Sequence, residues 1–202
     1  MLKKYLITAI LIVNSAHASQ LTDSALRLIQ IGTEIGSPDV VLRGNSLLLK
    51  GAFDLNDLDA LYETSIQARS GNELMGYAPQ NSMANELLMR LVILGYDKAM
   101  YEYGLYLLDG DGGLLKDELM ALNLFERSFQ VNGNPNSAFI AAVIRNESLV
   151  PGTNDMASVE EMLSFAILSN VKGAANYREQ HVRGGRWRSL LPSGWRRWLA
   201  DQ

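Results

Sequence analysis

Two stretches of the chain repeat small or apolar side chains with the period of an α-helix, and a glycine-rich segment separates them. In the first stretch these positions are Ala99, Met100, Tyr103, Gly104, Tyr106, Leu107 and Leu108. In the second, Ala121, Leu124, Phe125 and Ser128 lie at i, i+3, i+4 and i+7, which places them on one helix face. Residues 109–113 between them contain three glycines, which disfavour continuation of either helix. The pattern predicts a helix–elbow–helix unit over residues 95–133.

Capping residues and further glycines extend this pattern in both directions. Predicted N-caps are Asp97, Asp117, Ser37 before Pro38, Asn134 before Pro135, and Ser158 in a capping box with Glu161. Predicted terminators are Gly36, Gly51, Gly71, Gly95, Gly133 and Gly173. Without Gly51, these glycines are spaced 35, 24, 38 and 40 residues apart. The short interval predicts a unit around residues 76–79 whose first helix is truncated.

The central unit resembles the Sel1-like repeat, a relative of the tetratricopeptide repeat. The matching residues are Ala99, Tyr103, Gly104, Leu107, Gly110, Gly113, Leu114, Lys116, Asp117, Ala121, Phe125 and Gly133. The resemblance implies an all-α, antiparallel helix-pair solenoid of Sel1-like, tetratricopeptide-like repeats. It assigns residues 95–177 to Sel1-like repeats and residues 19–94 to N-terminal helices with degenerate repeats. It also implies a non-catalytic scaffold that binds a protein or peptide partner through its curved face.

Residues 1–18 have the pattern of a secretory signal peptide. Lys3 and Lys4 precede an apolar run of about ten residues, and Ala16-His17-Ala18 matches a cleavage site. The run is shorter than the roughly 20 apolar residues that a membrane-spanning helix needs. We therefore expect a periplasmic or secreted protein that is cleaved after Ala18.

Catalytic, cofactor and metal sites are not predicted. The sequence has no cysteine, which excludes a thiol nucleophile or a thiolate metal site. Counted from Asp109, the elbow lacks the oxygen ligands of an EF-hand loop. His181 has no triad pattern around it, and Glu160 and Glu161 are adjacent helix positions that point about 100° apart. The rival hypothesis is a cell-envelope protein that binds or hydrolyses peptidoglycan or another glycan.

Charge and aromatic residues separate the last segment from the rest. Residues 19–177 carry 10 Lys and Arg against 20 Asp and Glu, whereas residues 178–202 carry six Arg against two acidic residues. All three tryptophans lie in this tail, residues 178–202. Three interpretations fit it: a terminal cap on the repeats, peripheral contact with an anionic membrane, or docking of a partner protein. Nucleic acid is not an expected partner, because the body is acidic and export is predicted.

Aromatic and arginine side chains are the candidates for partner binding, because they bury a large area and keep a polar end. The candidates are Tyr96, Tyr101, Trp187, Trp195, Arg196, Arg197 and Trp198. For Tyr96 and Tyr101, core packing is the alternative. Tyr103 and Tyr106 are expected between helices. Gly104 is expected at a close helix contact that tolerates alanine and rejects leucine.

Overall fold

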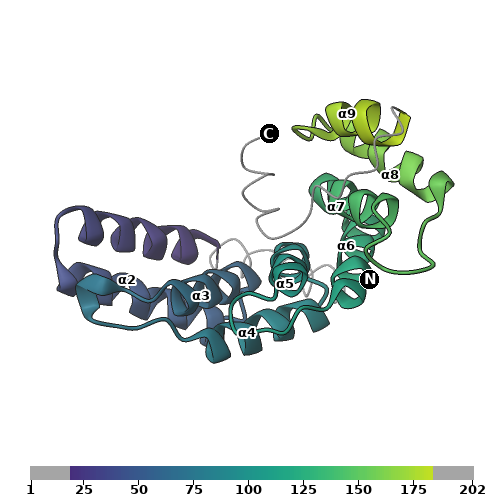
Figure 1. Ribbon diagram of the computed structural model, residues 1–202. Helices are drawn as coiled ribbons and strands as arrows, with labels where there is room; N and C mark the ends of the chain where they lie inside the picture. Colours follow the sequence, from purple (N-terminus) through teal and green to yellow (C-terminus); the bar gives the residue numbers. More distant parts are fainter. Residues whose placement is uncertain (1–18, 184–202) are drawn as a thin grey trace, which may run out of the picture. The chain divides into compact units, whose positions relative to one another are not determined.

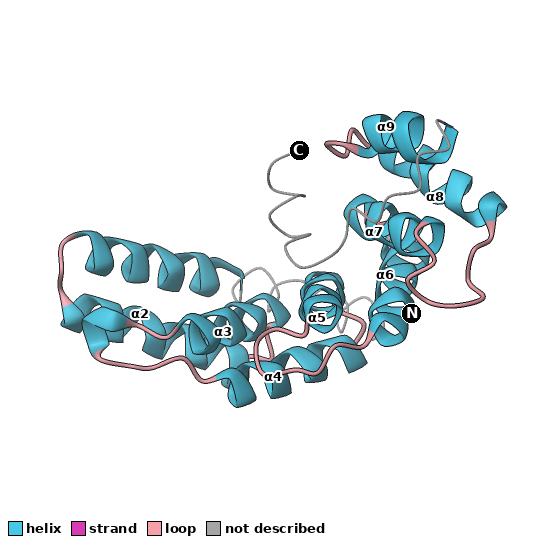
Figure 2. Ribbon diagram, viewed as in Figure 1, coloured by secondary structure: helices cyan, strands magenta, loops and turns pink. Residues whose placement is uncertain are grey.

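A computed structural model describes residues 19–183 of the chain. This part of the chain consists of helices joined by loops (Figures 1 and 2). An isolated β-bridge pairs Asn72 with Tyr77. The chain divides into two compact units, with the boundary between Leu94 and Gly95. Each unit is built from pairs of consecutive helices.

The first unit contains two helical hairpins. In chain order its elements are a helix over residues 19–34, α2 (Pro38–Leu49), the π-helical turn η1 (Lys50–Asp54), α3 (Leu58–Ser70), the short 3-10 turn η2 (Glu73–Met75) and α4 (Asn81–Ile93). Helix α3 packs against α4 and also against α2 and η1. The two hairpins therefore share one core, to which Val41, Leu48, Leu61 and Leu88 contribute fully buried side chains.

The prediction that a helix ends at Gly51 is wrong. Helix α2 continues into η1, and the chain turns only at Asn56, which has a φ of 53°. Gly51 is buried, and a Cβ atom there would lie 3.0 Å from the Cβ atom of Ala60 in α3. The glycine is therefore used for a close approach between η1 and α3.

The predicted truncated helix is also absent from the first unit. Helix α3 has 13 residues and ends at Gly71, as the sequence predicts, but α4 follows it as the second helix of the same hairpin. Residues 72–77 form the bridged turn between them, and the backbone N–H of Gln80 donates to the Ala68 carbonyl at 2.7 Å. The 24-residue interval between Gly71 and Gly95 thus lies within one hairpin rather than between two repeats.

The second unit contains two further hairpins and a short terminal helix. Its elements are α5 (Asp97–Asp109), α6 (Glu118–Asn132), α7 (Pro135–Asn146), α8 (Met156–Leu168), α9 (Ala174–Tyr177) and the π-helical turn η3 (Arg178–Arg183). Consecutive helices pack on one another from α5 to α9. The core includes the fully buried rings of Phe125 and Phe139.

Three helix ends of the second unit are those predicted from sequence. The Asp117 carboxylate accepts from the Met120 amide at 2.9 Å, and the Asn134 side chain accepts from the Ser137 amide at 3.0 Å ahead of Pro135. Gly133 has a left-handed φ of 65° after α6. These predictions are confirmed. Each could be made from sequence because it depends only on a few neighbouring residues.

Three helix-end predictions in the second unit are wrong. Tyr96 rather than Asp97 is the N-cap of α5. Asp155 rather than Ser158 caps α8, and the Ser158 hydroxyl donates to it; this bond, followed by the bond from the Ala157 amide, lowers the pKa of the Asp155 carboxyl. Helix α8 ends at Leu168, well before Gly173, which is instead the N-cap of α9.

Candidate functional site

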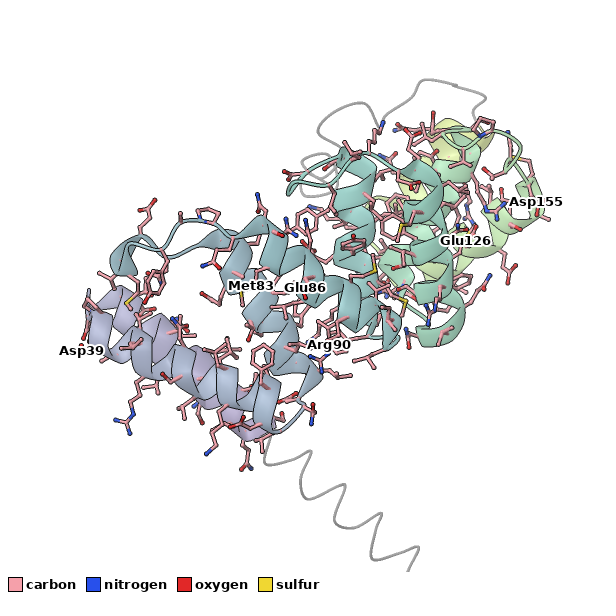
Figure 3. The ribbon with its side chains drawn as sticks, turned by 90° about the horizontal axis from the view of Figure 1, so that it is seen from below. Asp39, Met83, Glu86, Arg90, Glu126 and Asp155 are labelled. Atoms are coloured by element: carbon pink, nitrogen blue, oxygen red, sulfur yellow. The ribbon has the colours of Figure 1, made fainter. Side chains whose placement is uncertain are left out.

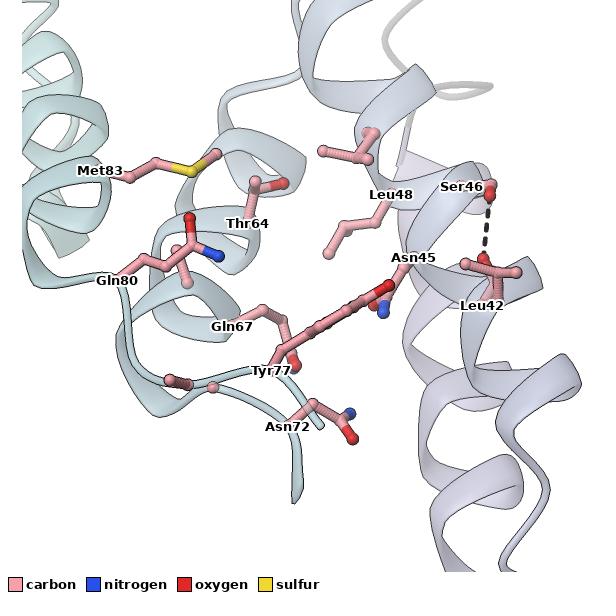
Figure 4. A pocket seen from close by; sticks show the side chains of 14 residues that line it. Leu42, Asn45, Ser46, Leu48, Thr64, Gln67, Asn72, Tyr77, Gln80 and Met83 are labelled. Carbon is pink, nitrogen blue, oxygen red and sulfur yellow. Dashed lines mark hydrogen bonds between the residues drawn. The ribbon is translucent and has the colours of Figure 1, made fainter. Parts of the chain in front are cut away.

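A groove in the first unit opens between α2 and α4, with α3 as its floor (Figure 4). Its cavity volume is about 240 Å³. The apolar lining residues are Leu42, Leu48, Leu49, Ala68, Gly71, Tyr77, Ala78 and Met83. The polar lining residues are Asn45, Ser46, Thr64, Gln67, Asn72 and Gln80. We call this site the α2–α4 groove.

The apolar walls of the groove are exposed to solvent. Leu42 and Leu49 on α2 are 49% and 43% exposed, and Tyr77 is 52% exposed. Met83 and Glu86 lie one turn apart on α4 (Figure 3), and only Met83 lines the groove. The groove is thus an apolar surface that the described residues of its own unit leave uncovered.

The polar groups of the groove are neutral amides and hydroxyls. Asn72 uses its Oδ1 atom to accept from the Met75 amide at 3.1 Å, which leaves its Nδ2 protons as donors. Within residues 19–183, the side-chain amides of Asn45, Gln67 and Gln80 form no hydrogen bond. The Ser46 hydroxyl donates to the Leu42 carbonyl at 2.9 Å (Figure 4). Several donors and acceptors therefore face the groove with capacity for a ligand.

The groove carries no charged residue in its lining. A general acid–base pair needs two titratable groups within hydrogen-bond reach of a substrate, and the lining contains one, the Tyr77 phenol. Within residues 19–183 no group of three or more His, Cys, Asp or Glu side chains is placed to hold a metal ion. The arrangement can bind a neutral ligand by apolar contact and by amide hydrogen bonds.

The candidates Tyr96 and Tyr101 lie in the second unit, in different surroundings. Tyr101 is half-buried, its ring meets Phe125 edge-on with centroids 6.0 Å apart, and it lines a small cavity of about 140 Å³. The other lining residues of this cavity are Asn136, Phe139, Ile140, Val171 and Lys172. Tyr96 is outside that lining, and the Lys98 ammonium lies 5.9 Å from the centroid of its ring. Tyr101 therefore combines core packing with a polar surface site.

The remaining candidates, Trp187, Trp195, Arg196, Arg197 and Trp198, lie outside the described residues, as does the signal-peptide segment 1–18. Tyr103 and Tyr106 are 5% and 7% exposed, which confirms the expectation that they pack between helices.

Asp97 joins three helices of the second unit. Its carboxylate accepts hydrogen bonds from the Ser128 hydroxyl of α6 and, at 2.7 Å, from the Asn134 amide that caps α7. The Ser128 and Ser137 hydroxyls are 2.8 Å apart and both side chains are buried. The side chain that the sequence predicts as a local cap thus holds neighbouring hairpins together.

Asp97→Ala should lower the free energy of unfolding by about 2–4 kcal/mol, because two hydrogen bonds to a charged acceptor are lost and Ser128 is buried. Urea unfolding monitored by circular dichroism measures the change. Asp97→Asn should have a smaller effect, because one acceptor oxygen remains. Glu161→Ala, which removes an exposed carboxylate from α8, should leave the stability within about 0.5 kcal/mol of the parent. Equal stability of Asp97→Ala and the parent would contradict the bridging role.

Sequence reasoning missed the α2–α4 groove, although part of its signal is visible. Leu42, Ser46, Leu49 and Phe53 follow one another at helical spacing on α2 and η1, and each is exposed. The other wall and the floor come from α3, α4 and the turn between them, so only the folded chain brings the site together.

This architecture defines an all-α protein of repeated helical hairpins. Its structure is similar to the crystal structure of a Sel1 repeat protein from Oxalobacter formigenes, with a TM-score of 0.66 and 17% sequence identity, over 91% of this chain and 71% of that one. No family model matches the sequence, and no curated protein matches it. The structural similarity shows that the chain has a Sel1-like repeat fold, as the sequence predicts.

Proposed function

We propose that this protein is an exported, non-catalytic scaffold that binds a protein or peptide partner. The α2–α4 groove supports the proposal, because its apolar walls are exposed and its amides have unused hydrogen-bonding capacity. Exposed apolar area of this kind is what a partner covers in a helical-repeat scaffold. The tail, residues 178–202, would add a second contact with the partner or with an anionic membrane surface.

Site-specific photo-crosslinking tests the proposal directly. A photoreactive amino acid at Ser46, which lines the groove, should crosslink to a defined polypeptide in the envelope of the producing cell. The same amino acid at Ser24 serves as the matched control. Ser24 is also exposed and donates to the carbonyl four residues earlier, but it lies on the helix of residues 19–34, outside the groove. Crosslinks of equal yield at both positions would contradict a groove-specific partner.

The rival function, binding or hydrolysis of peptidoglycan, predicts a different result. The protein would sediment with purified cell wall, and a hydrolase would lose turnover when one carboxylate is replaced. The absence of carboxylates from the groove lining favours the scaffold over a hydrolase acting there. If the protein sediments with purified cell wall and Ser46→Trp abolishes this sedimentation, the groove binds a glycan rather than a polypeptide.

Export is proposed on the pattern of residues 1–18. The protein isolated from the envelope fraction should begin at Ser19, and Ala18→Leu should leave the precursor uncut, because the cleavage site requires small residues. N-terminal sequencing checks both statements. Gln20→Leu is a control that keeps the predicted cleavage motif. Recovery of an intact Met1 terminus from the envelope fraction would disprove cleavage.

A further inference from the structure

We propose that the α2–α4 groove binds an extended, uncharged peptide segment, with one bulky apolar side chain in the cavity and the peptide backbone hydrogen bonded to groove amides. The proposal rests on the scaffold function above and specifies the chemistry of its partner. Three properties of the groove lead to it: neutrality, the arrangement of its amides, and size.

The uncharged lining of the groove disfavours a charged ligand. No Lys, Arg, Asp, Glu or His lines the groove. A charged side chain that enters such a site loses hydration and gains no opposite charge in return. The occupant must therefore be neutral where it contacts the groove, even though the chain as a whole carries a net charge of −4.

The amides favour an extended chain over a helix. Asn45 on α2, Gln67 on α3 and Gln80 ahead of α4 face the groove from three sides, and each offers a carbonyl acceptor and an amide donor. A helical peptide satisfies its backbone groups internally, so docking it would bury these amides without partners. An extended peptide presents free N–H and C=O groups that the amides can bind.

The size of the cavity suits one side chain. Its volume of about 240 Å³ is below the roughly 300–1,000 Å³ of drug-sized ligand sites. Leu48 of α2 is 2% exposed, and Met83 and Tyr77 form the rim at 38% and 52% exposure. The unbranched methionine side chain can adjust to different apolar groups. A leucine, isoleucine, methionine or phenylalanine side chain matches this lining.

A peptide array with the purified full chain tests the proposal. The probes are N-acetylated nine-residue peptides with varied neutral flanks and Leu, Phe, Ala, Asp or Lys at the centre. Binding should concentrate in the Leu and Phe sets, and Asp or Lys at the centre should abolish it. The tightest peptide is then remade with N-methylated backbone amides, which should weaken its binding at least tenfold.

Matched variants assign the binding to the groove. Ser46→Trp fills the groove and should remove binding of the tightest peptide, whereas Ser24→Trp should leave it unchanged. Gln67→Ala should raise the Kd about three- to tenfold by removing amide hydrogen bonds, and Gln130→Ala, at an exposed amide of α6, should have no effect. Circular dichroism confirms that each variant is folded.

Each contrary outcome overturns the inference in a recognisable way. Preference for charged centres, tolerance of N-methylation, or binding that survives Ser46→Trp would each disprove it. If a polypeptide crosslinks at Ser46 but its contacting segment binds only as a helix, the scaffold function stands and the inference fails. If no array peptide binds and no polypeptide crosslinks, both fail.

Discussion

Gly104→Leu should lower the free energy of unfolding by about 3 kcal/mol, at or above the upper end of the usual range for overpacked cores. A Cβ atom on Gly104 would lie 2.9 Å from the Cε1 and Cζ atoms of Phe125, whose ring is fully buried. Real Cβ atoms do not approach other atoms so closely, so the ring must move. The larger leucine side chain cannot be placed by a small shift.

Gly104→Ala should also destabilise the protein, by about 1 kcal/mol, which corrects the sequence-based expectation of a neutral change. Alanine gains up to about 1 kcal/mol in helix propensity over glycine, and this gain offsets only part of the clash with Phe125. Urea unfolding measures both variants. Asn123→Ala, at an exposed position of α6, is the control and should change little.

A double-mutant cycle identifies the clash as the cause. Phe125→Leu opens space beside Gly104, so Gly104→Ala should cost less in that background than in the parent. If Gly104→Leu unfolds at the same urea concentration as the parent, Gly104 does not lie at a close contact between α5 and α6. Additive effects of Gly104→Ala and Phe125→Leu would show that the two positions do not interact.

Local sequence signals predicted the helices better than the features that join them. Asp117, Asn134-Pro135 and Gly133 act through hydrogen bonds within a few residues, so the sequence was sufficient to place them. Asp97 and Gly51 carry similar local signals, but each is used for contact with another helix. The roles of Asp97 and Gly51 depend on how neighbouring helices pack, and the spacing of residues in the sequence does not indicate that packing.

The candidate site was less predictable than the fold. Tyr101 lines a surface cavity, and its part in binding a partner stays a prediction. The α2–α4 groove depends on a turn, residues 72–77, that interrupts the repeat pattern, and on the separation of two helices by α3. Its amides also give weak sequence signals, since Asn and Gln are common on helix surfaces.

Tyr177→Ala should lower the free energy of unfolding by about 3–5 kcal/mol, as is typical of removing a buried aromatic ring. Tyr177 is 2% exposed, and its ring meets Phe139 edge-on with centroids 5.8 Å apart. Its hydroxyl accepts from the Asn146 amide and donates to the Glu147 carboxylate, both at 2.9 Å. The Tyr177 side chain thus connects α9 to α7 through ring packing and hydrogen bonds. Urea unfolding of Tyr177→Ala measures its contribution to stability.

Tyr177→Phe isolates the hydroxyl and should cost about 1–3 kcal/mol, because the buried Asn146 amide then loses its partner. Burial raises the pKa of the Tyr177 phenol above its ordinary value of about 10, the Asn146 hydrogen bond lowers it, and the Glu147 charge raises it again. A raised pKa in the folded state means that the unfolded chain releases this proton first as pH increases. The stabilisation is therefore complete below about pH 10 and declines above it.

The stability difference between the parent and Tyr177→Phe should accordingly stay constant from pH 7 to about pH 9.5 and shrink as the pH rises further. Urea unfolding at intervals from about pH 7 to 11 measures this difference, and titration of the other tyrosines and lysines largely cancels between the two proteins. Tyr77→Phe provides the control, since it removes the hydroxyl of a ring that is 52% exposed. A constant difference between parent and Tyr177→Phe up to about pH 11 would show that the Tyr177 phenol ionises as readily in the folded protein as in the unfolded chain.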